Sequence, residues 1–303
     1  MFTPGTRVLA KNVFTSGVDM ICEVSSSQYQ EGKTMFGTKR VFHVRFQFLV
    51  AMGGEHFTMC EFLETMDSFE GTRPLKDLPF LPLSLFENQN NAEQIRAEFR
   101  SRGEIYSKCA TKASFMAYGR ASFYPKGAHR GKNDVNHSPG RIIVDTQRGY
   151  EAGHSVTVGY DPMIMSIKYK LKEYMLCTRQ RDQNKTKPNS TIDDVGMVLF
   201  GSVPDDYLEM TWPAIVGFSF TSKIWGDVLV DGLSEITFQE SAFDRLVLPH
   251  KRKRMIKALV RHSSDSFKDI VSGKGEGSVF LLWGPPGVGK VKKSHSFECV
   301  LCL

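Results

Sequence analysis

Residues 39–52 read KRVFHVRFQFLVAM, and apolar and polar side chains alternate along them. One face of an extended strand would carry four large apolar side chains, those of Phe42, Val44, Phe46 and Phe48. The other face would carry a more polar set, namely Val41, His43, Arg45 and Gln47. A period of two predicts a β-strand with one buried and one solvated face, which is typical of antiparallel sheets.

The segments on either side extend this pattern over residues 1–86. The predicted strands there are TRVLAK (6–11), MICEVSSSQY (20–29) and HFTMCEFLETM (56–66). Gly53-Gly54 fits a tight hairpin turn, and residues 69–86 contain three prolines, which discourage regular structure. We therefore expect a small antiparallel sheet or open barrel, closed by an irregular segment.

A helix and further strands are predicted next. Residues 89–109 show helical spacing of apolar side chains, which Gly103 weakens somewhat. The expected buried face consists of Ala92, Ile95, Phe99, Arg102, Tyr106 and Cys109. Residues 112–180 are expected to return to strands. The strands expected there and beyond are SFMAYGRASFY (114–124), RIIVDTQ (141–147), HSVTVGY (154–160) and two short ones within 213–236. A Ser-Lys turn should join the last two, and residues 181–194 are polar enough to form a surface loop or linker.

Another helix and an apolar strand are predicted towards the end of the chain. Pro249 suits a first helical turn, where its missing N–H donor would be unpaired anyway. The helix itself is HKRKRMIKALVRHS (250–263), with an expected apolar face of Met255, Leu259 and His262. SVFLLW (278–283) is typical of a short, buried parallel strand.

Composition limits the class of protein. The chain has 303 residues, of which 41% are hydrophobic and 24% charged, enough for about two domains. A net charge of +6 allows an anionic partner without requiring one. The six cysteines form no spaced disulfide framework, and neither a secretory signal nor an apolar run of about 18 residues is found. We expect an intracellular protein of the cytoplasm or nucleus, not secreted and with no membrane partner.

The most specific motif is a glycine-rich loop directly after the apolar strand. It matches G-x-x-x-x-G-K and consists of Gly284, Pro285, Pro286, Gly287, Val288, Gly289 and Lys290. Glycines let successive N–H groups point at phosphate oxygens, and Lys290 would reach the β- and γ-phosphates. These seven residues are the predicted ATP-binding site, and the loop should open a helix whose positive end faces the same anion.

Position 291 departs from this motif. The motif has a Ser or Thr whose hydroxyl binds Mg²⁺, whereas Val291 offers no oxygen, so we predict no metal ligand there. Only 303 − 290 = 13 residues follow Lys290, although a whole domain takes about 100–150 residues. Because the acidic metal ligand and the water-positioning residue belong to later strands, we predict no catalytic residue in this chain.

The order of these elements resembles the AAA family of ATPases. WGPPGVGK (283–290) follows FDRLVLP (243–249), a helix, a Gly-rich turn and an apolar strand. Residues 213–290 are similar to a group of fungal AAA proteins in which an N-terminal domain of unknown function precedes the ATPase module. MFTPGTRVLA (1–10) and residues 69–86 resemble pieces of that domain.

The resemblance implies ATP binding, Mg²⁺-dependent hydrolysis in a ring-forming homo-oligomer, and remodelling of an unknown substrate. The family's threonine after the lysine is Val291 here. Its acidic metal site, polar sensor and arginine finger have no counterparts to inherit. Family members also usually carry sequence before the point where this chain begins, so we expect a shortened N-terminus.

Residues 291–303 resemble no part of the family. Every valine codon begins with GU, as most intron donor sites do. We therefore hypothesise read-through of an intron directly after Lys290, which transcript sequencing across that junction would test.

Several weaker features are more simply explained by ordinary structure. Cys299-Val-Leu-Cys302 has CxxC spacing but no second ligand pair for zinc. Lys251–Arg254 fits a nuclear-import or nucleic-acid patch, although a solvated helix face is the commoner explanation. Phe243 and Asp244 lie where AAA proteins commonly hold adenine, yet Phe243 is more simply a core residue. The histidines show no H-x-x-x-H pairing.

Together these observations predict an α+β fold. A mainly antiparallel β domain with helices would precede the first helix and strand of an incomplete P-loop α/β ATPase domain. The predicted divisions are a β-rich domain (1–180), a polar loop or linker (181–194), short strands (195–248), the start of the ATPase domain (249–290) and a non-homologous tail (291–303). We expect an ATP-binding protein with a protein partner or substrate, unable to hydrolyse ATP alone. The alternative is a protein-binding module without nucleotide activity, and a nucleic-acid binder has the least support.

Overall fold

The chain divides into two compact units, Met1–Ile236 and Thr237–Leu303. The computed structural model describes residues 2–13, 17–34, 37–53, 56–67, 71–72, 74, 78, 80–85, 89–125, 138–153, 162–183, 197–237 and 249–262. Within the second unit the described element is one helix, α4 (His250–His262), which begins directly after Pro249 as predicted. None of the described helices is long and apolar enough to cross a membrane.

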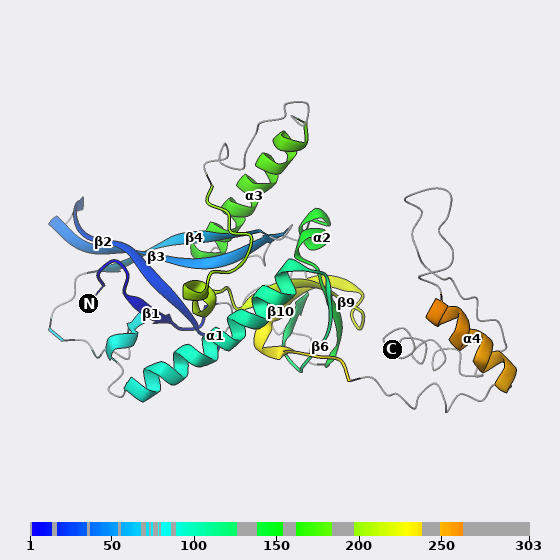
Figure 1. The fold of residues 1–303 in the computed structure, drawn as a ribbon. Coiled ribbons are helices and arrows are strands. Elements are labelled where there is room, and N and C mark those ends of the chain that lie inside the picture. The colour runs from blue at the N-terminus through cyan, green and yellow to red at the C-terminus, as the bar shows by residue number, and fades with distance from the viewer. Residues whose placement is uncertain are drawn as a thin grey trace. The chain divides into compact units, whose positions relative to one another are not determined.

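The first unit contains a five-stranded antiparallel sheet in the order β4-β3-β2-β1-β5 (Figure 1). Its strands are β1 (Arg7–Ala10), β2 (Met20–Thr34), β3 (Gly37–Gly53), β4 (His56–Asp67) and β5 (Phe80–Pro82). The predicted alternation is confirmed along residues 44–48, because Phe46 and Phe48 are buried whereas Arg45 is exposed. The side chains of residues 49–52 are all buried. The predicted hairpin is confirmed as well, with Gly53 paired to His56.

The sequence predicts no regular structure for residues 69–86, and this is wrong for β5. Leu81 pairs with Leu9 of β1, which places β5 at the edge of the sheet. A proline is tolerated on an edge strand because its missing N–H donor costs no ladder bond there. The short 3-10 helix η2 (Leu83–Leu85) follows directly.

The second sheet has six antiparallel strands in the order β11-β6-β8-β9-β10-β7 and curls into a half-barrel (Figure 1). Its strands are β6 (Ser114–Tyr118), β7 (Phe123–Pro125), β8 (Gly140–Val144), β9 (Ala214–Ser219), β10 (Ile224–Leu229) and β11 (Leu233–Ser234). The turn predicted between β9 and β10 is confirmed, with Lys223 at a φ of 57°. Because β9 pairs with β8, strands from both sides of the predicted loop 181–194 lie in one sheet.

Helices account for the remaining regular structure of the described first unit. They are α1 (Gln89–Thr111), α2 (Thr146–Glu151), α3 (Pro162–Gln183) and the 3-10 helices η4 (Asp205–Met210) and η5 (Val230–Gly232). The predicted helix at 89–109 is confirmed. Its expected face is buried at Phe99, Arg102, Tyr106 and Cys109 and half-buried at Ala92 and Ile95.

The expectation that residues 112–180 return to strands is wrong for α2 and α3. In α3, Ile164, Ile167 and Leu171 recur at helical spacing and are buried. The helix also runs three residues into the polar stretch 181–194, because Arg and Gln are good helix formers. The strand predicted at 154–160 lies outside the described residues.

The far end of β3 joins the two sheets. Pairing between β2 and β3 stops at Glu23–Gln47, so the next backbone groups of β3 on that side need other partners. The Trp212 amide donates to the Leu49 carbonyl at 2.9 Å. The Ala51 amide donates to the Tyr106 hydroxyl at 2.8 Å.

A second tyrosine also forms a hydrogen bond with the end of β3. The Tyr150 hydroxyl of α2 donates to the Ala51 carbonyl at 3.3 Å. Both tyrosines are buried, which raises the pKa of the hydroxyl in Tyr106 and in Tyr150. Segments after residue 87 therefore satisfy the buried backbone of β3.

Gly103 lets α1 approach η4 closely. A Cβ atom at this position would overlap the backbone carbonyl of Leu208. From the sequence alone, Gly103 only lowers the helix propensity of this segment. In the structure, the close packing of α1 against η4 requires a residue without a Cβ atom.

We predict that Gly103→Ala destabilises the protein by about 1–3 kcal/mol, because backbone atoms must move to admit the methyl group. Helix propensity alone predicts the opposite sign, a gain of about 1 kcal/mol. Urea unfolding at pH 7 measures the difference. Gly201→Ala is the control and should change stability by less than about 0.5 kcal/mol, since its Cβ would meet open space. A stabilised Gly103→Ala variant would contradict this packing.

Candidate functional site

The predicted phosphate-binding loop, Gly284–Lys290, lies outside the described residues, and so does Val291. The same holds for Phe243, Asp244 and the Cys299–Cys302 pair. The geometry below therefore concerns the first unit and helix α4.

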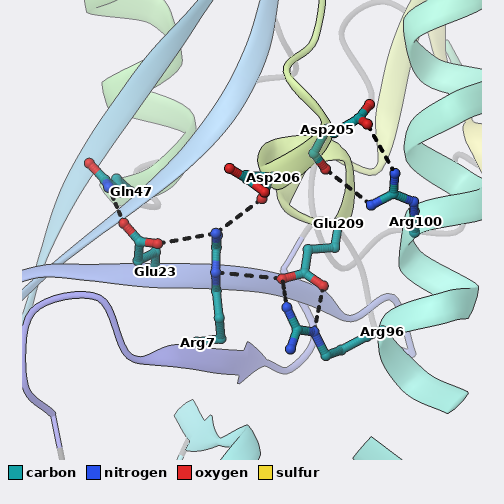
Figure 2. Close-up of polar contacts among 8 residues, drawn as sticks. All are labelled: Arg7, Glu23, Gln47, Arg96, Arg100, Asp205, Asp206 and Glu209. Carbon is teal, nitrogen blue, oxygen red and sulfur yellow. Dashed lines mark hydrogen bonds and ion pairs between the residues drawn. The ribbon is translucent and has the colours of Figure 1, made fainter. Parts of the chain in front are cut away.

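A cluster of charged and polar side chains joins η4 to the first sheet and to α1 (Figure 2). We call it the Glu209 cluster. Its members are Arg7, Glu23, Gln47, Arg96, Arg100, Asp205, Asp206 and Glu209. Arg96 Nε and Nη2 donate to the two Glu209 oxygens at 2.8 and 3.0 Å, a bidentate pair. The hydrogen bond to Glu209 raises the pKa of the Arg96 guanidinium.

Arg7 links this carboxylate to the sheet. Its Nε lies 3.5 Å from Glu209 Oε1, and its Nη2 lies 3.2 Å from Glu23 Oε2. Arg7 Nη2 also donates to the Asp206 carbonyl at 3.0 Å, and Gln47 donates to Glu23 at 2.6 Å.

The Glu209 cluster stabilises the fold and has no geometry for catalysis. Glu209 is only 7% exposed, and each of its oxygens is engaged by a guanidinium. A general base must instead reach a substrate proton within hydrogen-bond distance. Among the described residues, no group of three or more His, Cys, Asp and Glu side chains could hold a metal ion.

The described surface has a groove where α3 lies beside the edge of β4, which we call the β4–α3 groove. It holds about 400 Å³. Its lining comprises Thr58, Met59, Glu61, Ser166, Tyr169, Lys170, Glu173, Met197 and Val198. Lys170 Nζ lies 3.3 Å from Glu173 Oε2, so these two charges largely offset each other.

A buried thiol lies behind this groove. Cys60 of β4 is fully buried, and burial raises the pKa of its thiol to about 12. It is therefore a neutral core residue at pH 7, because only the thiolate is a nucleophile.

Helix α4 carries a dense positive charge. It contains Lys251, Arg252, Lys253, Arg254, Lys257 and Arg261 and no acidic residue. The side chain of Met255, which belongs to the predicted apolar face, is 58% exposed. The side chains of Leu259 and His262 lie outside the described part.

Comparison with known families finds a match at the start of the chain. A family model described as "Domain of unknown function (DUF7025)" matches residues 1–87. No curated protein and no solved structure matches the chain. The match covers the first sheet, β1 to β5, where residues 1–10 and 69–86 had suggested an N-terminal domain of unknown function.

Sequence analysis missed both the Glu209 cluster and the β4–α3 groove. A partial signal existed for the first, because Arg96 and Arg100 lie four residues apart on α1 and project from the same side of the helix. Their partners in the cluster, Glu209 and Asp205, are more than 100 residues away, and no local pattern reveals such a pairing.

We predict that Glu209→Gln lowers the free energy of unfolding by about 2 kcal/mol, because it leaves Arg7 and Arg96 facing a neutral amide. Urea unfolding at pH 7 measures this loss. Glu104→Gln is the matched control, since its exposed contact with Arg100 spans 3.9 Å; it should cost less than about 0.5 kcal/mol. Equal effects of the two substitutions would rule out a structural role for the buried pair.

We also predict that stability falls as the pH rises above about 9, partly through Cys60. The unfolded thiol loses its proton near pH 9, whereas the buried thiol keeps it to about pH 12. This group's stabilising contribution is therefore complete below pH 9 and is lost between pH 9 and 12. From pH 8 to pH 10 the loss should be about 1.5 kcal/mol smaller in Cys60→Ala than in the unaltered chain.

The control is Val24→Ala, which also truncates a fully buried side chain of the first sheet. It should retain the full pH dependence, because no ionisable group is removed. Urea unfolding at pH 8, 9 and 10 provides the measurement. An identical pH dependence in Cys60→Ala would show that the thiol ionises equally in both states.

Proposed function

We propose that this chain is an ATP-binding protein of the AAA type whose first unit recognises a partner or substrate protein. The observation that carries the proposal is the sequence GPPGVGK at 284–290, directly after an apolar run. Backbone N–H groups of such a loop hold phosphate oxygens, and Lys290 supplies a positive charge.

Val291 limits the chemistry of the proposed site. Without a hydroxyl after the lysine, Mg²⁺ lacks its usual protein ligand, and the metal otherwise offsets the charge of the transition state. We therefore propose weak ATP binding that does not depend on Mg²⁺, with no hydrolysis by this chain alone.

The first unit supports a recognition role. It forms a compact unit, and among its described residues we find no metal-binding group. Its surface offers an open groove beside an edge strand. The second candidate function is a protein-binding module with no nucleotide activity. It is supported by the same features of the first unit and does not involve residues 284–290.

We predict that Lys290→Ala weakens ATP binding about tenfold or more, since it removes a charged contact to phosphate. Lys293→Ala is the matched control and should bind as the unaltered chain does. Val291→Thr should introduce Mg²⁺ dependence. Calorimetry with and without Mg²⁺ measures all three.

Three results would overturn the proposal or part of it. Binding that is unchanged in Lys290→Ala would show that ATP does not use this loop. No measurable binding in any variant would favour the second candidate. Mg²⁺-dependent ATP turnover by the unaltered chain would contradict the role given to Val291.

A further inference from the structure

Strand β4 forms an edge of the first sheet. Backbone N–H and C=O groups alternate between the two sides of an antiparallel strand. Phe57 directs its groups away from β3, because its amide donates to the Phe200 carbonyl at 2.9 Å and its carbonyl accepts from the Phe200 amide at 2.8 Å. The backbone groups of every second residue after Phe57 therefore also point away from β3. These residues are Met59, Glu61, Leu63 and Thr65.

The edge already pairs with one extended segment and then becomes free. Residues 197–200 approach β4 and pair with it at Phe57 in the antiparallel sense. The backbone pairing does not continue beyond Phe57. The Thr58 hydroxyl donates a hydrogen bond to the Val198 carbonyl at 2.8 Å, so a side chain occupies this carbonyl. Within the described part of the chain, the backbone groups of Met59, Glu61, Leu63 and Thr65 have no hydrogen-bond partner.

The β4–α3 groove begins where this free edge begins. Met59 and Glu61 line one side, and α3 supplies the other with Tyr169, Lys170 and Glu173. Tyr169 is 67% exposed and Leu63 of the edge is 42% exposed. A groove beside an unpaired strand is the arrangement that peptide-binding domains use for strand addition.

We infer that the β4–α3 groove binds an extended segment of a partner protein, which adds to the edge of β4 as a further strand. The inference deepens the recognition role proposed for the first unit. A polypeptide is the ligand that matches a row of alternating donors and acceptors, whose repeat is about 6.8 Å for every second residue. Glu61 is exposed and forms no ion pair with any described residue, so the segment carries Lys or Arg beside it.

The test uses the full chain, without nucleotide, and a fluorescein-labelled peptide of sequence Val-Thr-Val-Lys-Val-Thr-Val. A second peptide is N-methylated at alternate residues, which removes the donors of one edge. Anisotropy should show binding of the first peptide, and about tenfold or weaker binding of the methylated one. Amide exchange of Glu61 and Leu63 should slow about tenfold when the first peptide is added.

Two kinds of variant locate the binding to the edge. Leu63→Pro removes an N–H that faces away from β3, where proline is tolerated, and should weaken binding about tenfold. Leu63→Thr keeps that N–H and should bind within about threefold of the unaltered chain. Glu61→Lys should lose affinity for the lysine peptide and gain it for a peptide with Glu in place of Lys. If Leu63→Pro does not fold, this exchange of peptide preference in Glu61→Lys tests whether the peptide binds at the edge of β4.

Several outcomes would overturn the inference. They are equal binding of the methylated peptide, no response to Leu63→Pro in a folded variant, and no change of preference in Glu61→Lys. Sedimentation showing dimers that Leu63→Pro abolishes would assign the edge to a second copy of the chain instead. Because nucleotide is absent, none of these results depends on whether residues 284–290 bind ATP.

Discussion

The end of β3 imposes the main constraint on this fold. Beyond Gln47 the strand no longer pairs with β2, and buried backbone groups without partners each cost about 1–3 kcal/mol. Trp212, Tyr106 and Tyr150 supply those partners, and they come from three separate segments of the chain. The hydrogen bonds thus fix α1, α2 and the approach to β9 around one end of the first sheet.

The family match and the folded unit differ in extent. The domain of unknown function is matched over residues 1–87, whereas the compact unit runs to Ile236. The Glu209 cluster ties η4 to β1 and α1 on the same sheet (Figure 2). Residues 1–87 supply the sheet, and the following residues complete its core and its hydrogen bonds.

Much of the local structure could be predicted from the sequence, and little of the tertiary contacts could be. The period of two along residues 39–52 predicted β3, and helical spacing predicted α1, because both signals reside in neighbouring residues. The sequence did not predict β5, because prolines usually break strands. Proline is tolerated on an edge strand, but the strand order of the sheet is needed to place β5 at the edge. From the sequence, Gly103 only lowers the helix propensity of α1, because the close approach of the Leu208 backbone is a tertiary contact. The predicted site at 284–290 lies outside the described residues and stays a prediction.

The central claim is that residues after 87 complete the first sheet. The most direct measurement compares urea unfolding of a fragment of residues 1–87 with that of a fragment of residues 1–237. We expect the longer fragment to unfold in one cooperative transition. The shorter one should show neither a cooperative transition nor protected amides in β3, since Leu49 and Ala51 would lose their partners. Cooperative unfolding of residues 1–87 alone, with β3 protected, would contradict the account.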